Sequence, residues 1–349
     1  MVRRRAVVVG IGGASALVVA GGAWRVLRRP DRAIGPWRVL AEPVADVRLD
    51  AFRHAILAPN PHNRQPWLIR LDGPDAALLT CDLTKRLPET DPCDRQITLG
   101  FGTFIELARI AASHRGFRIE VTPFPQGEPQ PRLDARPLAH MRFVRDFALA
   151  PDPLRPAIPR RHTSREVFSG APTLAQLATL ARDGAQASAD PRLLDQIRPI
   201  SVAAMTKEIT LPRTWMESVR LLRIGAGEID ATPDGLALSG PMIEATALAG
   251  MTTRATLADP ASTAFRMGLE QQQAVCGSVP GVAWRWAGRC TRSDSHSRNI
   301  PRWRTCSPTF TVSLTSGPRR GSRCWCASGS ARRCCRPRAI RWRRTSFDD

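Results

Sequence analysis

The chain has 349 residues, of which 43% are hydrophobic and 23% are charged. This balance is that of a globular protein, and it excludes wholesale disorder and a polytopic membrane protein. The formal net charge of +20 would ordinarily indicate a nucleic acid or another anionic partner. However, residues 285–349 alone hold 16 Arg against 3 Asp, with neither Lys nor Glu, so much of that charge comes from one segment.

The first 30 residues have the pattern of a membrane-directed segment. A run of arginines that begins at Arg3 precedes an uncharged, mostly apolar stretch over 6–24, and further arginines follow it. A stretch of this length just spans a bilayer, whereas the small residues at 21–23 favour a cleaved export signal. The adjacent arginines also resemble a twin-arginine signal. We therefore expect residues 1–30 to be a signal or a membrane anchor.

The same stretch allows a competing interpretation. The letters at 7–13 are similar to a strand that enters a dinucleotide-binding glycine turn, but that pattern needs a third glycine where Ser15 stands. The arginines on both sides suit a membrane-directed segment better and leave its orientation open. The sequence therefore favours an exported protein or one that associates with the membrane of the cell envelope through 6–24. A cytoplasmic location stays open.

Hydrophobic spacing predicts a helix, a hairpin and a longer helix in the first part of the chain. The predicted elements are a helix over 44–57, strands over 67–71 and 77–83, a helix over 97–114, and strands over 117–124 and 141–149. Between the last two strands, the proline-rich and polar stretch over 125–137 is expected to be a loop.

Four prolines within 151–159 are expected to exclude regular structure there and to form a linker. The predicted boundary divides the chain into a first half over 31–151 and a second half over 152–284. In the second half, the spacing predicts helices over 173–183 and 214–225. Helices that alternate with short strands indicate a mixed α/β or α+β fold.

A polar run between the first helix and the first strand is one candidate site. It contains Asn60, His62, Asn63 and Gln65 and ends at Trp67. Amides at such a turn can donate to and accept from a planar heterocycle that has carbonyls and ring nitrogens. The alternative is a turn whose amides satisfy the local backbone. His62 could orient a substrate or protonate a product, although a lone histidine in a turn is more often simply hydrogen-bonded there.

A second polar run follows the proline-rich linker. It contains Arg161, Thr163 and Arg165, and forked guanidiniums interleaved with hydroxyls can clasp a phosphate. The alternative is a solvated basic turn, which is the usual meaning of a charge run. The two runs together are more informative than either alone, because one suits a ring and the other suits a phosphate.

Two motifs together resemble the nitroreductase family of FMN-dependent oxidoreductases: Pro59-x-x-x-Asn63-x-Gln65-Pro66-Trp67 and, about a hundred residues later, Arg161-x-Thr163-x-Arg165. More narrowly, the chain resembles the long Acg-like members, which have two nitroreductase-like halves and often a twin-arginine signal. Further likeness lies at 87–95, 223–225 and 233–236, and the resemblance covers about 35–280. It implies an α+β sandwich of two related halves, the second incomplete here, with FMN at their junction.

By this resemblance, FMN would be held at its phosphate by Arg161, Thr163 and Arg165, and at its isoalloxazine ring by Asn63 and Gln65. NAD(P)H would be the co-substrate, and a small nitroaromatic or quinone-like molecule would accept the electrons. Because the flavin carries the hydride, no catalytic side chain is assigned, and no metal is expected. The alternative is a flavin-sequestering protein without turnover. Two halves in one chain allow a monomer, and a homodimer stays open.

Residues 285–349 do not have the composition of a folded domain. They contain many Arg, Ser, Cys and Trp but a single Leu and a single Val, and their six cysteines lack the paired spacing of a zinc module. When 298–310 is back-translated with allowed codons and read two bases later, it gives a string that resembles the C-terminal segment of Acg-like proteins. We therefore expect a frameshifted or disordered basic tail, without a specific nucleic-acid partner. A non-functional truncated product is a further alternative.

Overall fold

The structure of the protein is a computed structural model that describes residues 22, 24–180, 185–285 and 310–311. The expected signal or anchor over 1–30, the glycine turn at 7–13 and the expected tail over 285–349 lie mostly outside these residues. The helices are α2 (Gly35–Arg38), α3 (Val47–Ala55), α4 (Arg95–Ser113), α5 (Leu174–Leu180), α6 (Pro191–Thr210), α7 (Pro212–Arg220), α8 (Gly225–Ala231), α9 (Pro241–Leu248), α10 (Arg254–Ala258) and α11 (Thr263–Gly277), with short 3-10 helices η1 (Val39–Ala41), η2 (Pro61–Asn63), η3 (Leu83–Lys85) and η4 (Arg155–Arg160). The strands are β1 (Trp67–Asp72), β2 (Ala76–Cys81), β3 (Phe117–Pro123), β4 (Ala139–Arg145), β5 (Ala185–Ser188), β6 (Leu222–Ile224), β7 (Leu236–Leu238), β8 (Val282–Arg285) and β9 (Phe310–Thr311).

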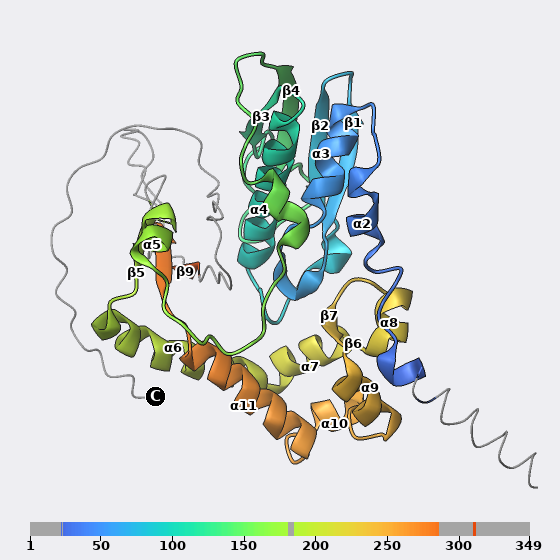
Figure 1. Cartoon of the computed structure of the whole chain (residues 1–349), viewed down its shortest axis with the longest axis vertical. Helices are drawn as coiled ribbons and strands as arrows, with labels where there is room; N and C mark the ends of the chain where they lie inside the picture. Colours follow the sequence, from blue (N-terminus) through green and yellow to red (C-terminus); the bar gives the residue numbers. More distant parts are fainter. Residues whose placement is uncertain (1–21, 23, 181–184, 286–309, 312–349) are drawn as a thin grey trace, which may run out of the picture.

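A four-stranded antiparallel sheet organises the first half, in the order β1-β2-β4-β3. The predicted hairpin is confirmed: Trp67 pairs with Cys81 at one end, and Asp72 pairs with Ala76 beside the turn. Gly73 supplies the positive φ of 59° that this turn requires. In Figure 1, α3 and α4 lie against the sheet, and this upright lobe stands above α6, α7 and α11. The mixed helix-and-sheet architecture agrees with an α+β fold.

Aromatic side chains fill the space between the sheet and the two helices. Phe104 on α4 is fully buried, and its ring centroid lies 6.1 Å from that of Phe52 on α3 and 5.1 Å from that of Trp67 on β1. Phe143 on β4 meets Phe52 edge to face. Such pairs add to the free energy gained from burial, so this cluster fixes how α3 and α4 sit on the sheet. The predicted helices over 44–57 and 97–114 are confirmed as α3 and α4.

The proline-rich linker differs from its prediction. The expectation of no regular structure over 151–159 is wrong, because η4 spans Arg155–Arg160. Pro156 stands in the first turn of this 3-10 helix, where a missing N–H removes no hydrogen bond and a fixed φ favours helical backbone. The second half therefore begins with a short 3-10 helix.

The second half is mostly helical. The predicted helix over 173–183 is found as α5. The predicted helix over 214–225 is wrong at its end, because α7 stops at Arg220 and β6 follows, paired in parallel with β7. Of the helices that the structure describes, none has both the length and the apolar character that crossing a bilayer requires.

Candidate functional site

The loop between α3 and β1 has an unusual backbone. His62, Asn63 and Gln65 all adopt positive φ angles, of 48°, 49° and 49°. Non-glycine residues rarely occupy this region, which costs on the order of 1 kcal/mol or more each unless the surroundings compensate. Here Asn60 accepts a hydrogen bond from the Gln65 backbone N–H through its side-chain oxygen at 2.8 Å. Strain of this kind, held by local contacts, is typical of functional loops.

This loop is tied to a segment far away in the sequence. The side-chain amides of Asn63 and Gln65 both donate to the carbonyl oxygen of Pro233, at 3.1 and 3.2 Å. The backbone N–H of Gly235 donates in return to the carbonyl oxygen of Asn63 at 3.1 Å. The polar run that the sequence singles out therefore contacts the segment 233–235.

A charged cluster reinforces this junction. Asp234 is 9% exposed and forms ion pairs with Arg64 at 2.6 Å, Lys85 at 2.6 Å and Arg223 at 3.0 Å. Burial alone would raise the pKa of Asp234, but the hydrogen bonds from Lys85 and Arg223 and the surrounding positive charge hold that pKa below its usual range. We call these four residues the Asp234 cluster. It carries more positive than negative charge.

Gly235 allows the segment to pass close to its neighbours. Its φ is 96°, and a Cβ atom at this position would lie 2.3 Å from the carbonyl oxygen of Leu221. Only glycine fits such a backbone and such an approach. Gly235 therefore fixes the path by which Pro233 and Asp234 reach the polar loop.

The arginines of the second run lie on the same junction. Arg161 donates to the carbonyl oxygen of Leu57, just before the polar loop, at 3.0 Å. Arg165 donates to the carbonyl oxygen of Ala237 on β7 at 2.8 Å. Arg165 is exposed to solvent over part of its side chain. Desolvation by the surrounding chain nevertheless lowers the pKa of both Arg161 and Arg165.

The segment 233–237 contacts both runs, but from the second run it contacts Arg165 alone, whereas Arg161 contacts Leu57. Asn63 and Gln65 contact its first residue, and Arg165 contacts its last. Thr163 is exposed and makes no hydrogen bond to the described residues. The sequence did not single out Asp234 as a site residue, although it lies in the 233–236 stretch that carries the family likeness.

His62 joins the loop to α7. Its Nε2 atom lies 2.9 Å from the hydroxyl oxygen of Ser218, which is 6% exposed. Burial lowers the pKa of His62, so the neutral imidazole is favoured at neutral pH. Nothing in the sequence pattern pointed to Ser218, because its partner is 156 residues away.

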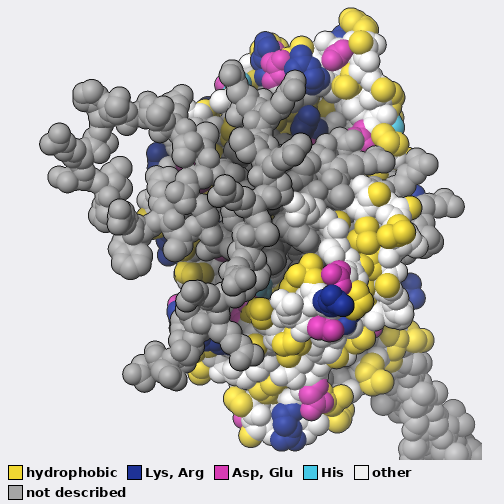
Figure 2. All heavy atoms as spheres, turned by 90° about the vertical axis from the view of Figure 1, so that its left-hand side faces the viewer, with side chains coloured by type: hydrophobic (Ala, Val, Ile, Leu, Met, Phe, Trp, Pro, Cys, Tyr) yellow, Lys and Arg dark blue, Asp and Glu magenta, His cyan; other side chains and the backbone are white. Residues whose placement is uncertain are grey.

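The described residues also bear on the requirements of a metal site and on the distribution of charge on one face. In the part of the chain that the structure describes, no group of three or more His, Cys, Asp or Glu is placed to hold a metal ion. Where side chains are coloured in Figure 2, Lys and Arg lie in small groups beside Asp and Glu. Arg142 and Glu120, 2.6 Å apart, are one such pair among the described residues.

The fold and the site define an α+β protein in which a polar loop meets a run of arginines at the contact between two parts of one chain. No family model matches the chain. It is similar to two proteins of Mycobacterium tuberculosis, from strains CDC 1551 / Oshkosh and ATCC 25618 / H37Rv, each named "Putative NAD(P)H nitroreductase". Each is 29% identical over 176 residues, which cover 48% of this chain and 48% of the relative. The chain spans about half the length of the curated relatives it matches, and the likeness supports the nitroreductase family at that level.

Proposed function

We propose that the chain is an FMN-dependent oxidoreductase of nitroreductase type, which takes hydride from NAD(P)H and passes electrons to a small nitroaromatic or quinone-like acceptor. The observation that carries this proposal is the convergence of the two polar runs on the segment 233–237. Relatives named as NAD(P)H nitroreductases support the reaction class.

The residues present fit a flavin phosphate. The Nε atom of Arg161 is buried and has no hydrogen-bond partner among the described residues. Neither Arg161 nor Arg165 forms an ion pair there, and desolvation lowers the pKa of each. A phosphate would supply both the missing acceptor and the missing counter-charge, because its oxygens match a guanidinium fork. The exposed hydroxyl of Thr163 would be free to add a third contact.

When bound, FMN supplies the hydride-transfer chemistry. The chain's own part is to hold and orient it. Asn63 and Gln65 would face the ring from a backbone that the Asp234 cluster and Gly235 keep in place. Rigid support of this kind is what a binding site needs from the residues behind it.

For the domain organisation of the whole chain, we propose the division that the sequence predicts. Residues 31–151 and 152–284 would be two nitroreductase-like halves, 1–30 would direct the chain to the cell envelope, and 285–349 would be read out of frame. The contacts between Asp234 and both Arg64 and Lys85 support the association of the halves. Resequencing the gene across codons 275–300 tests the last point: a single-base insertion or deletion is expected, and an intact frame contradicts it.

An FMN titration of the full chain tests the proposed function. We expect Arg161→Gln to weaken FMN binding by about tenfold or more, because a charge-assisted hydrogen bond to phosphate is lost. Riboflavin, which lacks the phosphate, should bind the parent chain and this variant equally. Arg160→Gln, next to Arg161 and outside the motif, is the matched control and should bind FMN normally. Equal binding of FMN by all three chains contradicts the phosphate role, and absence of any flavin binding contradicts the function.

A further inference from the structure

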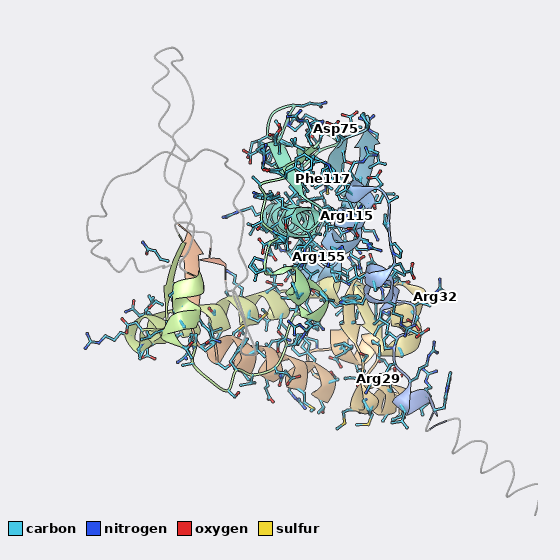
Figure 3. All side chains as sticks on the ribbon, turned by 45° about the horizontal axis from the view of Figure 1, so that its top comes forward. Arg29, Arg32, Asp75, Arg115, Phe117 and Arg155 are labelled. Atoms are coloured by element: carbon cyan, nitrogen blue, oxygen red, sulfur yellow. The ribbon has the colours of Figure 1, made fainter. Side chains whose placement is uncertain are left out.

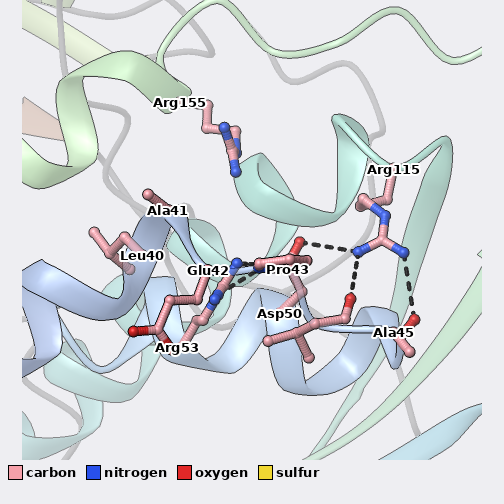
Figure 4. Close-up of a pocket in the computed structure, with 10 residues that line it drawn as sticks. Leu40, Ala41, Glu42, Pro43, Ala45, Asp50, Arg53, Arg115 and Arg155 are labelled. Carbon is pink, nitrogen blue, oxygen red and sulfur yellow. Dashed lines mark hydrogen bonds and ion pairs between the residues drawn. The ribbon is translucent and has the colours of Figure 1, made fainter.

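A pocket of about 760 Å³ lies where the first half meets the beginning of the second, and none of its lining residues belongs to the candidate site. It is formed by the segment 40–45, α3, the residue Arg115 just beyond α4, and the beginning of η4 (Figure 4). Leu40 and Val44 give it apolar surface, whereas Arg53, Arg115 and Arg155 give it positive charge. The pocket is open to solvent on one side, and its volume leaves room for a small molecule.

Two of the three arginines have structural partners. Arg53 forms an ion pair with Asp50 at 2.6 Å and donates to the carbonyl oxygen of Val39 at 2.8 Å. Arg115 donates to the carbonyl oxygen of Val44 at 2.9 Å and lies 3.4 Å from the Asp50 carboxylate. These two side chains therefore hold the segment before α3 in place, and they share one negative charge.

Arg155 is different, because its side chain has no acceptor among the described residues. Its Nε atom is buried and makes no hydrogen bond. Figure 4 shows the side chain pointing across the opening toward Arg53 and Asp50, and Figure 3 shows Arg155 beside Arg115 in the same lobe. Burial lowers the pKa of nearby His54, and the positive charge of Arg155 adds to that lowering. The positive charge of Arg155 therefore acts on His54, and its side chain forms no ion pair among the described residues.

A guanidinium N–H that is buried without an acceptor is rare in folded proteins, because leaving it unsatisfied is costly. The three arginines of the pocket face two carboxylates, Asp50 and the exposed Glu42, so one positive charge remains. A guanidinium fork matches the oxygens of a carboxylate or of a phosphate monoester. The apolar surface beside it would accept a small hydrocarbon or aromatic body.

We propose that this pocket binds a small organic anion, with its carboxylate or phosphate head on Arg155 and its apolar body against Leu40 and Val44. The pocket shares no lining residue with the proposed flavin site, and this inference does not rest on the proposed function. It requires only that the head group reach the unpaired guanidinium, which faces the opening (Figure 4).

Calorimetric titration of the full chain with benzoate and with phenyl phosphate tests the proposal. Phenol, which lacks the charge, and inorganic phosphate, which lacks the apolar body, are the comparison ligands. We expect at least one aromatic anion to bind more tightly than both, and Arg155→Gln to weaken its binding by about tenfold or more. Arg155→Lys, which keeps the charge but loses the fork, should give an intermediate affinity.

Arg70→Gln is the matched control, because Arg70 is an exposed arginine on β1 without an ion-pair partner among the described residues. It should bind the aromatic anion as the parent chain does. An equal loss in Arg70→Gln and Arg155→Gln means attraction to the overall positive charge and overturns the site. Unchanged binding of the aromatic anion in Arg155→Gln also overturns the site. So does the finding that neither benzoate nor phenyl phosphate binds the parent chain.

The His54 imidazole gives a local readout that does not depend on affinity. A bound anion offsets the charge of Arg155, so the pKa of His54 followed by NMR should rise in the parent chain when the anion is added. In Arg155→Gln it should already be raised and should no longer respond. Binding of the anion without any effect on His54 in the parent chain places the ligand elsewhere and contradicts the proposal.

Discussion

Replacing Asp234 by Asn tests how the two parts of the chain are held together. The substitution keeps the size of the side chain but removes a carboxylate. Among the described residues, this carboxylate alone forms ion pairs with all three of Arg64, Lys85 and Arg223. Arg64 is 9% exposed and cannot simply turn to solvent. Removal of one partner from a buried ion pair destabilises proteins by about 3–5 kcal/mol, because an uncompensated charge stays behind. Since Lys85 is partly exposed, we expect about 3 kcal/mol for Asp234→Asn.

The loss should depend on pH in a defined direction. The pKa of Asp234 in the folded chain is below its usual value, so its contribution is fully present above an unfolded pKa of about 3.9 and is lost as the pH falls through the folded pKa. The difference in the free energy of unfolding between the parent and Asp234→Asn should therefore be constant from about pH 7 to pH 5 and shrink below about pH 4.

Urea unfolding of the full chain, followed by circular dichroism, measures this difference. Glu120→Gln is the matched control, because Glu120 also contacts two arginines, Arg118 and Arg142, but on an exposed strand edge. Exposed ion pairs contribute little, so this variant should unfold close to the parent. The reasoning is refuted if Asp234→Asn destabilises the chain no more than Glu120→Gln, or if its effect is the same at low and neutral pH.

Two further predictions concern the first half. Phe104→Ala should lower the free energy of unfolding by about 3–5 kcal/mol, because it opens a cavity between Phe52 and Trp67, and a melting temperature near that of the parent would contradict the packing described. Burial raises the pKa of the Cys81 thiol to about 12, whereas Cys93 is exposed. Iodoacetamide at about pH 8 should therefore modify Cys93 and leave Cys81 unmodified in the native chain. Peptide mass spectrometry measures the modification of each cysteine. Rapid modification of Cys81 would contradict the packing of its strand.

Local pattern was sufficient to predict most of the first half. Alternation at Trp67 and the glycine at Gly73 indicated a hairpin, and the spacing of apolar residues indicated α3 and α4, because these elements bury one face against a single core. The pattern failed at Arg220, where α7 ends and a strand begins. There the backbone conformation depends on pairing with the parallel strand β7 and on the close contact at Gly235. Neither contact can be inferred from a short stretch of sequence.

The candidate site was likewise predicted only in part from the sequence. Residue type and order were enough to single out Asn63, Gln65 and Arg161, since amides and guanidiniums have well-defined partners. The contacts of Asp234 with Arg64 and Lys85 and the pairing of His62 with Ser218 join residues more than 100 positions apart, so only the fold reveals them. Long-range electrostatic contacts have no periodic signature, which is why sequence reasoning missed them.

The visible absorption spectrum of the purified full chain, supplied with FMN and recorded before and after NADPH is added without oxygen, tests the central proposal most directly. The account predicts a protein-bound flavin band that NADPH bleaches and that a nitroaromatic or quinone acceptor restores. A flavin band that NADPH leaves unchanged would instead favour the flavin-sequestering alternative. A chain that retains no flavin would contradict the role proposed for the two polar runs.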